Sequence, residues 1–82
     1  MSVIITLDKI LVKKKAIYKI VVKDSNFIKY TIDKIGFYNL TTNPKKIGIN
    51  GKKLAFWLSN GAQIRNKKLF NIIVNFYKNE SN

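Results

Sequence analysis

The sequence predicts an α+β fold, in which a mostly antiparallel or mixed sheet of four to five strands is combined with two helices in a single small domain over residues 1–82. A chain of 82 residues suits one domain with one modest hydrophobic core. In its first half, apolar and polar residues alternate, which is the period of strands. In its second half, apolar residues recur three and four positions apart, which is the period of helices.

Three alternating stretches predict neighbouring strands of one sheet, at residues 3–8, 17–23 and 28–37. The first two are joined by a basic connection at residues 13–15. The second and third are joined by residues 24–26, Asp-Ser-Asn, which are residue types whose side chains hydrogen-bond nearby backbone groups in turns.

The third stretch contains a predicted irregularity. Its alternation slips by one position, which indicates a bulge or break near residues 33–34. Gly36 marks either a close backbone approach or an irregular strand position. Residues 39–46, which include the only proline, predict a loop, and a short strand at residues 47–49 is expected to follow.

Two helices are predicted in the second half of the chain. Asn50 is a candidate N-cap for a helix near residues 51–60, and Gly61 is a candidate left-handed residue at its end. Asn66 is the candidate N-cap of a second helix near residues 67–78. The apolar stripe of this helix comprises Leu69, Ile72, Ile73 and Phe76, and is widened by Phe70, Val74 and Tyr77, so that much of the helix should be covered.

The aromatic side chains have two possible roles, which are packing in the core and stacking on unpaired bases. For one set the spacing favours the core, and this set comprises Tyr30, Phe37, Trp57 and Phe76. Tyr38 follows a glycine and precedes the predicted loop, so both roles stay open for it.

The charge of the chain indicates its partner. Sixteen Lys and Arg face four Asp and Glu, which gives a formal net charge of +12 at pH 7. A small domain tolerates such self-repulsion mainly when a polyanion neutralises it, so the expected partner is nucleic acid. All but one of the basic residues are Lys, which binds phosphate as a point charge and lacks the planar fork of Arg. Recognition should therefore rest on backbone and shape more than on bidentate base reading.

Lysine doublets also stand in the first turns of both predicted helices, at residues 52–53 and 67–68. The helix dipole disfavours positive charge there by roughly 0.3–1 kcal/mol each. A cost accepted twice indicates helix ends that face phosphate.

Composition argues against several other classes. The chain has no Cys and no His, which excludes a disulfide framework and a zinc finger and leaves poor choices for acid–base catalysis at neutral pH. Its carboxylates form no recognisable pair, so we expect no enzyme and no cofactor. The longest apolar run is far shorter than the roughly 20 residues that span a bilayer. The first seven residues look like a strand, so we expect no targeting peptide.

Three sequence elements resemble the bacterial-type small-subunit ribosomal protein family numbered sixteen. They are Tyr18-x-Ile-Val-x-x-Asp-Ser25, Lys34-Ile-Gly-Phe-Tyr-Asn39, and the segment at residues 55–63 that ends in Gly-Ala-Gln. Their order and nearly collinear spacing, together with a first strand and a basic hairpin, extend the resemblance over about residues 3–65.

This resemblance implies a structural protein of the small ribosomal subunit that binds the 5′ domain of the small-subunit rRNA and stabilises its assembly. Its implied partners are this rRNA and neighbouring small-subunit ribosomal proteins, with no membrane and no small-molecule substrate. Lys, Asn and Ile are encoded by A+T-rich codons, so the expected location is a ribosome in an organelle (mitochondrion or plastid) or in the cytoplasm of an A+T-rich bacterium. The candidate rRNA-binding residues are Lys9, Lys13, Lys14, Lys15, Tyr18, Lys23, Lys34, Tyr38, Asn39, Lys45, Lys46, Arg65 and Lys67.

Two alternatives remain at this point. A small basic RNA-binding protein or RNase acting outside the ribosome would share the charge, although an RNase needs an acid–base pair that the sequence does not show. A membrane-surface peptide would need one long basic amphipathic helix, whereas the alternating stretches favour a sheet.

Overall fold

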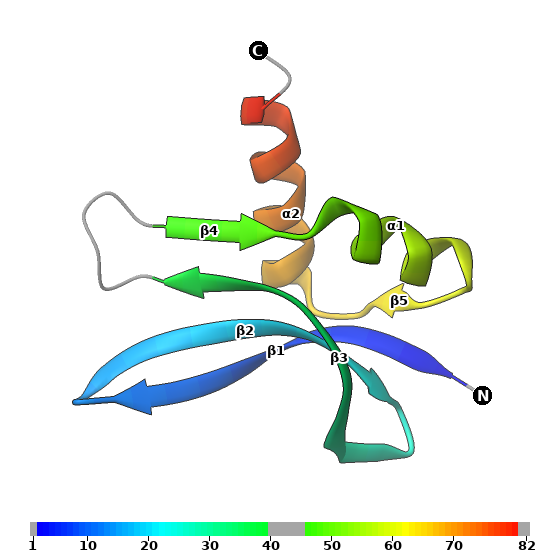
Figure 1. Cartoon of the computed structure of the whole chain (residues 1–82), viewed down its shortest axis with the longest axis horizontal. Helices are drawn as coiled ribbons and strands as arrows, with labels where there is room; N and C mark the ends of the chain where they lie inside the picture. Colours follow the sequence, from blue (N-terminus) through cyan, green and yellow to red (C-terminus); the bar gives the residue numbers. More distant parts are fainter. Residues whose placement is uncertain (1, 40–45, 81–82) are drawn as a thin grey trace.

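A five-stranded mixed sheet carries two helices in the computed structural model, which describes residues 2–39 and 46–80 (Figure 1). The elements are β1 (Val3–Val12), β2 (Lys15–Asp24), β3 (Phe27–Asn39), β4 (Lys46–Ile49), α1 (Gly51–Ser59), β5 (Gln63–Ile64) and α2 (Lys67–Glu80). The sheet order is β4-β3-β2-β1-β5, in which β5 runs parallel to β1 and the other neighbours are antiparallel. The predicted fold class is confirmed.

The first hairpin is longer than its alternating residues indicated. Its two strands pair over their full ten residues, from Val3 opposite Asp24 to Val12 opposite Lys15. Lys15 is therefore the first residue of β2, and the connection consists of Lys13 and Lys14 alone. The alternation ends early in the sequence because residues 10–12 and 16–17 are apolar at consecutive positions, so that apolar residues fall on both faces of the outer hairpin.

The irregularity in β3 is confirmed, and it falls on both sides of the predicted position. Ile35 lies between the partners of Ile20 and Val21, and Ile32 lies between the partners of Val22 and Lys23; neither has a counterpart in β2. Gly36 follows Ile35 and lies between β2 and β4, where a Cβ atom would collide with the carbonyl oxygen of Gly48. The close backbone approach therefore requires glycine at position 36.

Both predicted helix starts are confirmed by their caps. The side chain of Asn50 accepts a hydrogen bond at 3.2 Å from the backbone N–H three residues later. The side chain of Asn66 likewise accepts from the N–H groups of Lys68 and Leu69 at 2.9 and 3.2 Å. The first backbone N–H groups of a helix have no carbonyl partner within the helix, and these hydrogen bonds satisfy some of them.

The end of α1 also follows the sequence signal. Gly61 has a φ of 91°, in the left-handed region that glycine enters without strain. Its N–H donates to the carbonyl of Leu58 at 3.1 Å, and the N–H of Ala62 donates to the carbonyl of Trp57 at 2.9 Å. These two hydrogen bonds form a Schellman motif, which ends the helix before the chain continues into β5. Strand β5 was not predicted, because two residues are too few to show an alternation of apolar and polar side chains.

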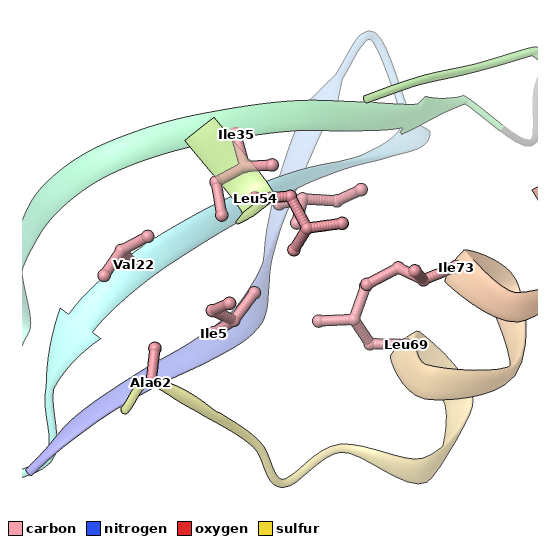
Figure 2. Close-up of a cluster of buried hydrophobic side chains, with 8 residues drawn as sticks. Ile5, Val22, Ile35, Leu54, Ala62, Leu69 and Ile73 are labelled. Carbon is pink, nitrogen blue, oxygen red and sulfur yellow. The ribbon is translucent and has the colours of Figure 1, made fainter. Parts of the chain in front are cut away.

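The hydrophobic core lies between one face of the sheet and the two helices. Figure 2 shows side chains from β1, β2, β3 and both helices pointing toward this shared interior. The buried cluster comprises Ile5, Ile20, Val22, Ile35, Leu54, Ala62, Leu69 and Ile73. Leu69 and Ile73 are 0% and 7% exposed, which confirms the central stripe of the second helix.

The helices cover less of the molecule than the sequence indicated. Tyr30 and Phe37 were expected in the core, but they are 72% and 41% exposed. Tyr30 lies in the first part of β3, and Phe37 pairs with Lys19 and Gly48 on the sheet face opposite the core. The side chains that widen the stripe of α2 (Phe70, Val74 and Tyr77) are exposed as well.

The other two aromatic residues expected in the core, Trp57 and Phe76, are half-buried, and Trp57 packs against the core. The two helices pack on one face of the sheet only, and with nine and fourteen residues they leave the ends of its ten- and thirteen-residue strands uncovered on that face as well.

Candidate nucleic-acid interface

The hairpin tip presents adjacent lysines in a strained turn. Lys13 and Lys14 have φ angles of 50° and 66°, both in the left-handed region. Two positive φ angles are typical of a two-residue type I′ hairpin turn, where Asn-Gly is the preferred sequence. Each lysine there costs roughly 1–2 kcal/mol relative to glycine. Both side chains are exposed, at the end of the hairpin that lies farthest from the core (Figure 1).

A row of residues crosses the sheet beside the first turn of α2, on the face that carries the core. Lys9, Tyr18 and Tyr38 stand opposite one another on β1, β2 and β3. The two tyrosine rings are tilted by 33° with centroids 6.4 Å apart. The ammonium group of Lys68, from the first turn of α2, lies 5.2 Å from the centroid of the Tyr18 ring, within the range of a cation–π interaction. We call these four residues the front row.

The exposed residues Arg65 and Lys67 lie three positions and one position before Lys68 in the chain. They carry positive charge to the start of α2, where backbone N–H groups and the helix dipole favour anions. Two predicted cations are therefore close to the front row along the chain, because they precede its member Lys68.

Other candidates lie on the opposite face of the sheet. Strand residues alternate between faces, so the positions on β2 that flank Ile20 and Val22 face away from the core. This back face carries Lys15, Lys19, Lys23, Lys34, Asn39 and Lys46, whose pairings run across β2, β3 and β4. The sheet therefore divides the predicted residues between two surfaces that meet at the hairpin tip.

Two lysines are paired with carboxylates of the chain itself. The Nζ atom of Lys23 lies 2.7 Å from Oδ1 of Asp8, and the side chain of Lys23 is only 12% exposed. The Nζ atom of Lys53 lies 2.9 Å from Oδ1 of Asp33. Lys53 therefore turns toward β3, and the expectation that both lysines of residues 52–53 face phosphate does not fit this position.

Asp33 joins α1 to the sheet. One carboxylate oxygen accepts a hydrogen bond from Lys53, and the other accepts from the indole N–H of Trp57 at 3.0 Å. The hydrogen bond from the Lys53 ammonium, and after it the bond from Trp57, hold the pKa of Asp33 below its usual value. The carboxylate is a structural anchor and stays ionised at neutral pH.

The carboxylates of Asp8, Asp24 and Asp33 all have structural roles. Asp8 and Asp33 are in the ion pairs above, and the carboxylate of Asp24 accepts from the backbone N–H of Asn26 at 2.8 Å, as the predicted turn requires. Residues 2–39 and 46–80 contain no group of three or more potential metal ligands. Within the same ranges, no helix is long and apolar enough to cross a membrane.

One predicted position is not described by the structure, and some exposed cations were not predicted. Lys45 lies outside the described residues. Lys19, Lys29 and Lys68 are exposed cations that the candidate set omits. The position of Lys68 over Tyr18 joins residues fifty positions apart, which no local pattern reveals.

Comparisons with known proteins agree on one family. A sequence model described as Ribosomal protein S16 matches residues 12–65, which is more than half of the chain. The small ribosomal subunit protein bS16 of Clostridium beijerinckii is 44% identical over 75 residues, covering 87% of this chain and 93% of the relative. The bS16 protein of Caldicellulosiruptor saccharolyticus is 45% identical over 65 residues, covering 77% and 80%. That of Karelsulcia muelleri is 48% identical over 65 residues, covering 77% and 58%.

Proposed function

The chain belongs to the ribosomal protein S16 family, and from this premise we propose that it binds the 5′ domain of the small-subunit rRNA and stabilises the folded arrangement of that RNA. As a member of this family it is a structural protein of the small ribosomal subunit and not an enzyme.

The distribution of lysine over two faces of one sheet is the observation that carries the proposal. The front row and the back face point in opposite directions from a thin layer, and the hairpin tip joins them. Cations on both sides of a rigid sheet can neutralise phosphates of two RNA segments at once. Phosphate contacts fix position and orientation, and double-stranded RNA is recognised mostly by shape and 2′-hydroxyls. A domain so charged would hold adjoining rRNA helices together.

The proposed contact residues follow from this arrangement. Lys13, Lys14 and Lys15 supply the tip and its first back-face position. The front surface is supplied by Lys9, Tyr18, Tyr38, Arg65 and Lys67, and the back surface by Lys34, Asn39 and Lys46. Lys45, which lies outside the described residues, stays a proposed contact on the sequence alone. Lys23 joins the back surface with a charge that Asp8 already balances in part.

The cellular setting is a second part of the proposal. The compared relatives are bacterial, which favours the cytoplasm of a bacterium with A+T-rich codon usage over a mitochondrion or plastid. Neighbouring small-subunit ribosomal proteins are the proposed protein partners there.

Binding to the transcribed 5′ domain of Clostridium beijerinckii small-subunit rRNA tests the proposal. The wild-type chain should bind with an affinity that falls steeply with salt, with a log–log slope of about −4 to −9 if six to ten lysines neutralise phosphates. The double variant Lys13→Ala/Lys14→Ala should flatten this slope by about 1–2. Lys52→Ala/Lys78→Ala removes the same charge from exposed helix positions that are not among the proposed contact residues, and it serves as the control.

Three results would argue against the proposal. Equal losses in both double variants would mean that only net charge matters. Normal incorporation of the Lys13→Ala/Lys14→Ala variant into small subunits would move the RNA surface away from the tip. Cleavage of RNA with multiple turnover by the purified wild-type chain would support the RNase alternative.

A further inference from the structure

The beginning of β3 exposes an unusual amount of apolar surface. Phe27, Ile28, Tyr30 and Ile32 are 63%, 60%, 72% and 47% exposed, within a segment of six residues that we call the 27–32 arm. Among the described residues, neither aromatic ring of this arm pairs with another ring. Isolated exposed apolar residues are ordinary, but four in one short segment indicate a surface that is covered by a partner.

The backbone explains why these side chains are exposed. Thr31 pairs with Lys23 and Phe27 pairs with Asp24, so that residues 28–30 have no counterparts in β2. The extra residues bend the strand out of the sheet. In Figure 1 the first part of β3 lies away from both helices, so its side chains do not pack in the hydrophobic core.

The composition of the arm favours RNA over a protein partner. Lys29 stands between Ile28 and Tyr30 and is exposed, and it is the only charged residue from position 27 to position 32. Lysine is depleted from the buried centres of protein–protein interfaces. Single-stranded nucleic acid, in contrast, is bound by aromatic rings that stack on bases beside cations that neutralise phosphates. The arm also continues along β3 into Lys34 and Asn39, which belong to the proposed RNA surface.

We propose that the 27–32 arm is a second kind of rRNA contact, in which the ring of Tyr30 stacks on an unpaired base while Lys29 neutralises an adjoining phosphate. Phe27 and Ile28 exclude water from the sides of this stack. The inference rests on the proposed rRNA binding and adds a contact of different physical nature, because stacking contributes affinity without neutralising a phosphate.

Substitutions at position 30 separate stacking from charge. With the same 5′-domain transcript and the full chain, Tyr30→Ala should weaken binding by about 5- to 150-fold, the range for loss of one stacked base. Its salt slope should equal that of the wild type, whereas Lys29→Ala should flatten the slope by roughly 0.7–0.9. Tyr30→Phe should bind as the wild type does, and Tyr30→Leu should lose affinity as Tyr30→Ala does. Phe70→Ala removes an exposed aromatic side chain from α2 and should change nothing.

The outcomes separate this inference from the proposed function. If the wild type fails to bind the transcript, the proposed function fails with it. If the wild type binds and Tyr30→Ala binds equally well, only the arm proposal is wrong. Full recovery by Tyr30→Leu would show apolar packing in place of stacking. Normal RNA affinity with impaired incorporation of Tyr30→Ala into small subunits would show that the arm contacts a protein. Fluorescence of Trp57, the only tryptophan, monitors folding of every variant.

Discussion

Asp33 shows how a strongly basic chain uses one of its few carboxylates. It accepts hydrogen bonds from Lys53 and Trp57 of α1, so that a single side chain of β3 fixes the helix over the sheet. A charged acceptor makes each of these bonds stronger than a bond between neutral groups. At residue scale the acidic positions therefore stabilise the domain, and most lysines remain exposed.

The lowered pKa of Asp33 predicts a pH dependence of stability with a defined sign. The folded pKa lies below the unfolded one, so the stabilisation is fully present above the ordinary Asp value of about 4 and is lost as pH falls through the folded value. Urea unfolding should show the wild type more stable than Asp33→Asn at pH 7, with the difference shrinking below pH of about 4. A difference that stays constant from pH 7 to pH 2 would contradict the role of the charge.

Trp57 contributes both packing and a donor, and two substitutions separate them. Trp57→Phe keeps a ring against the core but removes the bond to Asp33, so it should cost about 1–2 kcal/mol of unfolding free energy. Trp57→Ala should cost about 2–4 kcal/mol, somewhat below the cost for a fully buried tryptophan because the ring is half-buried. Chemical unfolding followed by circular dichroism measures both values. Equal costs would mean that the ring packing contributes little.

At the scale of elements, the first hairpin extends beyond the part of the sheet that the helices cover. Its inner half carries the core residues Ile5 and Ile20, and its outer half ends in the turn at Lys13 and Lys14. The inner half fixes the register of pairing because a slip by one residue would move its apolar side chains to the wrong face. The outer half is then free to carry residues chosen for binding.

The strained turn predicts opposite changes in stability and binding. Replacing Lys13 and Lys14 by Asn and Gly relieves two left-handed lysines and should stabilise the isolated domain by about 1–3 kcal/mol. The same variant should bind rRNA more weakly, because two phosphate contacts are lost. Thermal unfolding and filter binding on one preparation check both effects. Lys13→Ala/Lys14→Ala is the control, since it removes the charges without relieving the φ strain. A destabilised Asn-Gly variant would contradict the turn type.

For the whole molecule, the net charge of +12 is the dominant property. Two of the sixteen basic residues are neutralised locally, in the ion pairs Lys23–Asp8 and Lys53–Asp33. The excess positive charges repel one another in the isolated domain and attract a polyanion when one is bound. The same charges therefore destabilise the free protein and strengthen its complex.

Salt should consequently act in opposite directions on folding and on binding. Raising KCl from 0.05 to 0.2 M screens the self-repulsion and should raise the melting temperature of the isolated chain. Over the same interval the affinity for the 5′-domain transcript should fall by roughly 10²- to 10⁵-fold, as the expected slope of about −4 to −9 requires. Calorimetry and binding titrations at matched salt concentrations measure the two effects. A melting temperature that falls with salt would show that attractive ion pairs outweigh the repulsion.

Elements with local sequence signals could be predicted before the fold was known. Asn50, Asn66 and Gly61 predicted helix boundaries correctly, because caps depend on hydrogen bonds within a few residues. The slip in the alternation located the bulge in β3, and Gly36 indicated the close approach to β4. The net charge indicated a nucleic-acid partner, and the family motifs indicated a ribosomal role, which the comparisons bear out.

Tertiary structure decided which side chains are covered and which cations lie together. Tyr30 and Phe37 have the apolar character of core residues, but exposure depends on where the helices lie and not on the residue itself. The division of lysines between two faces follows from pairing across strands, and Lys68 meets Tyr18 only because α2 folds back onto the sheet. Burial and clustering arise from contacts between distant parts of the chain, whereas composition and periodicity report only on neighbours in sequence.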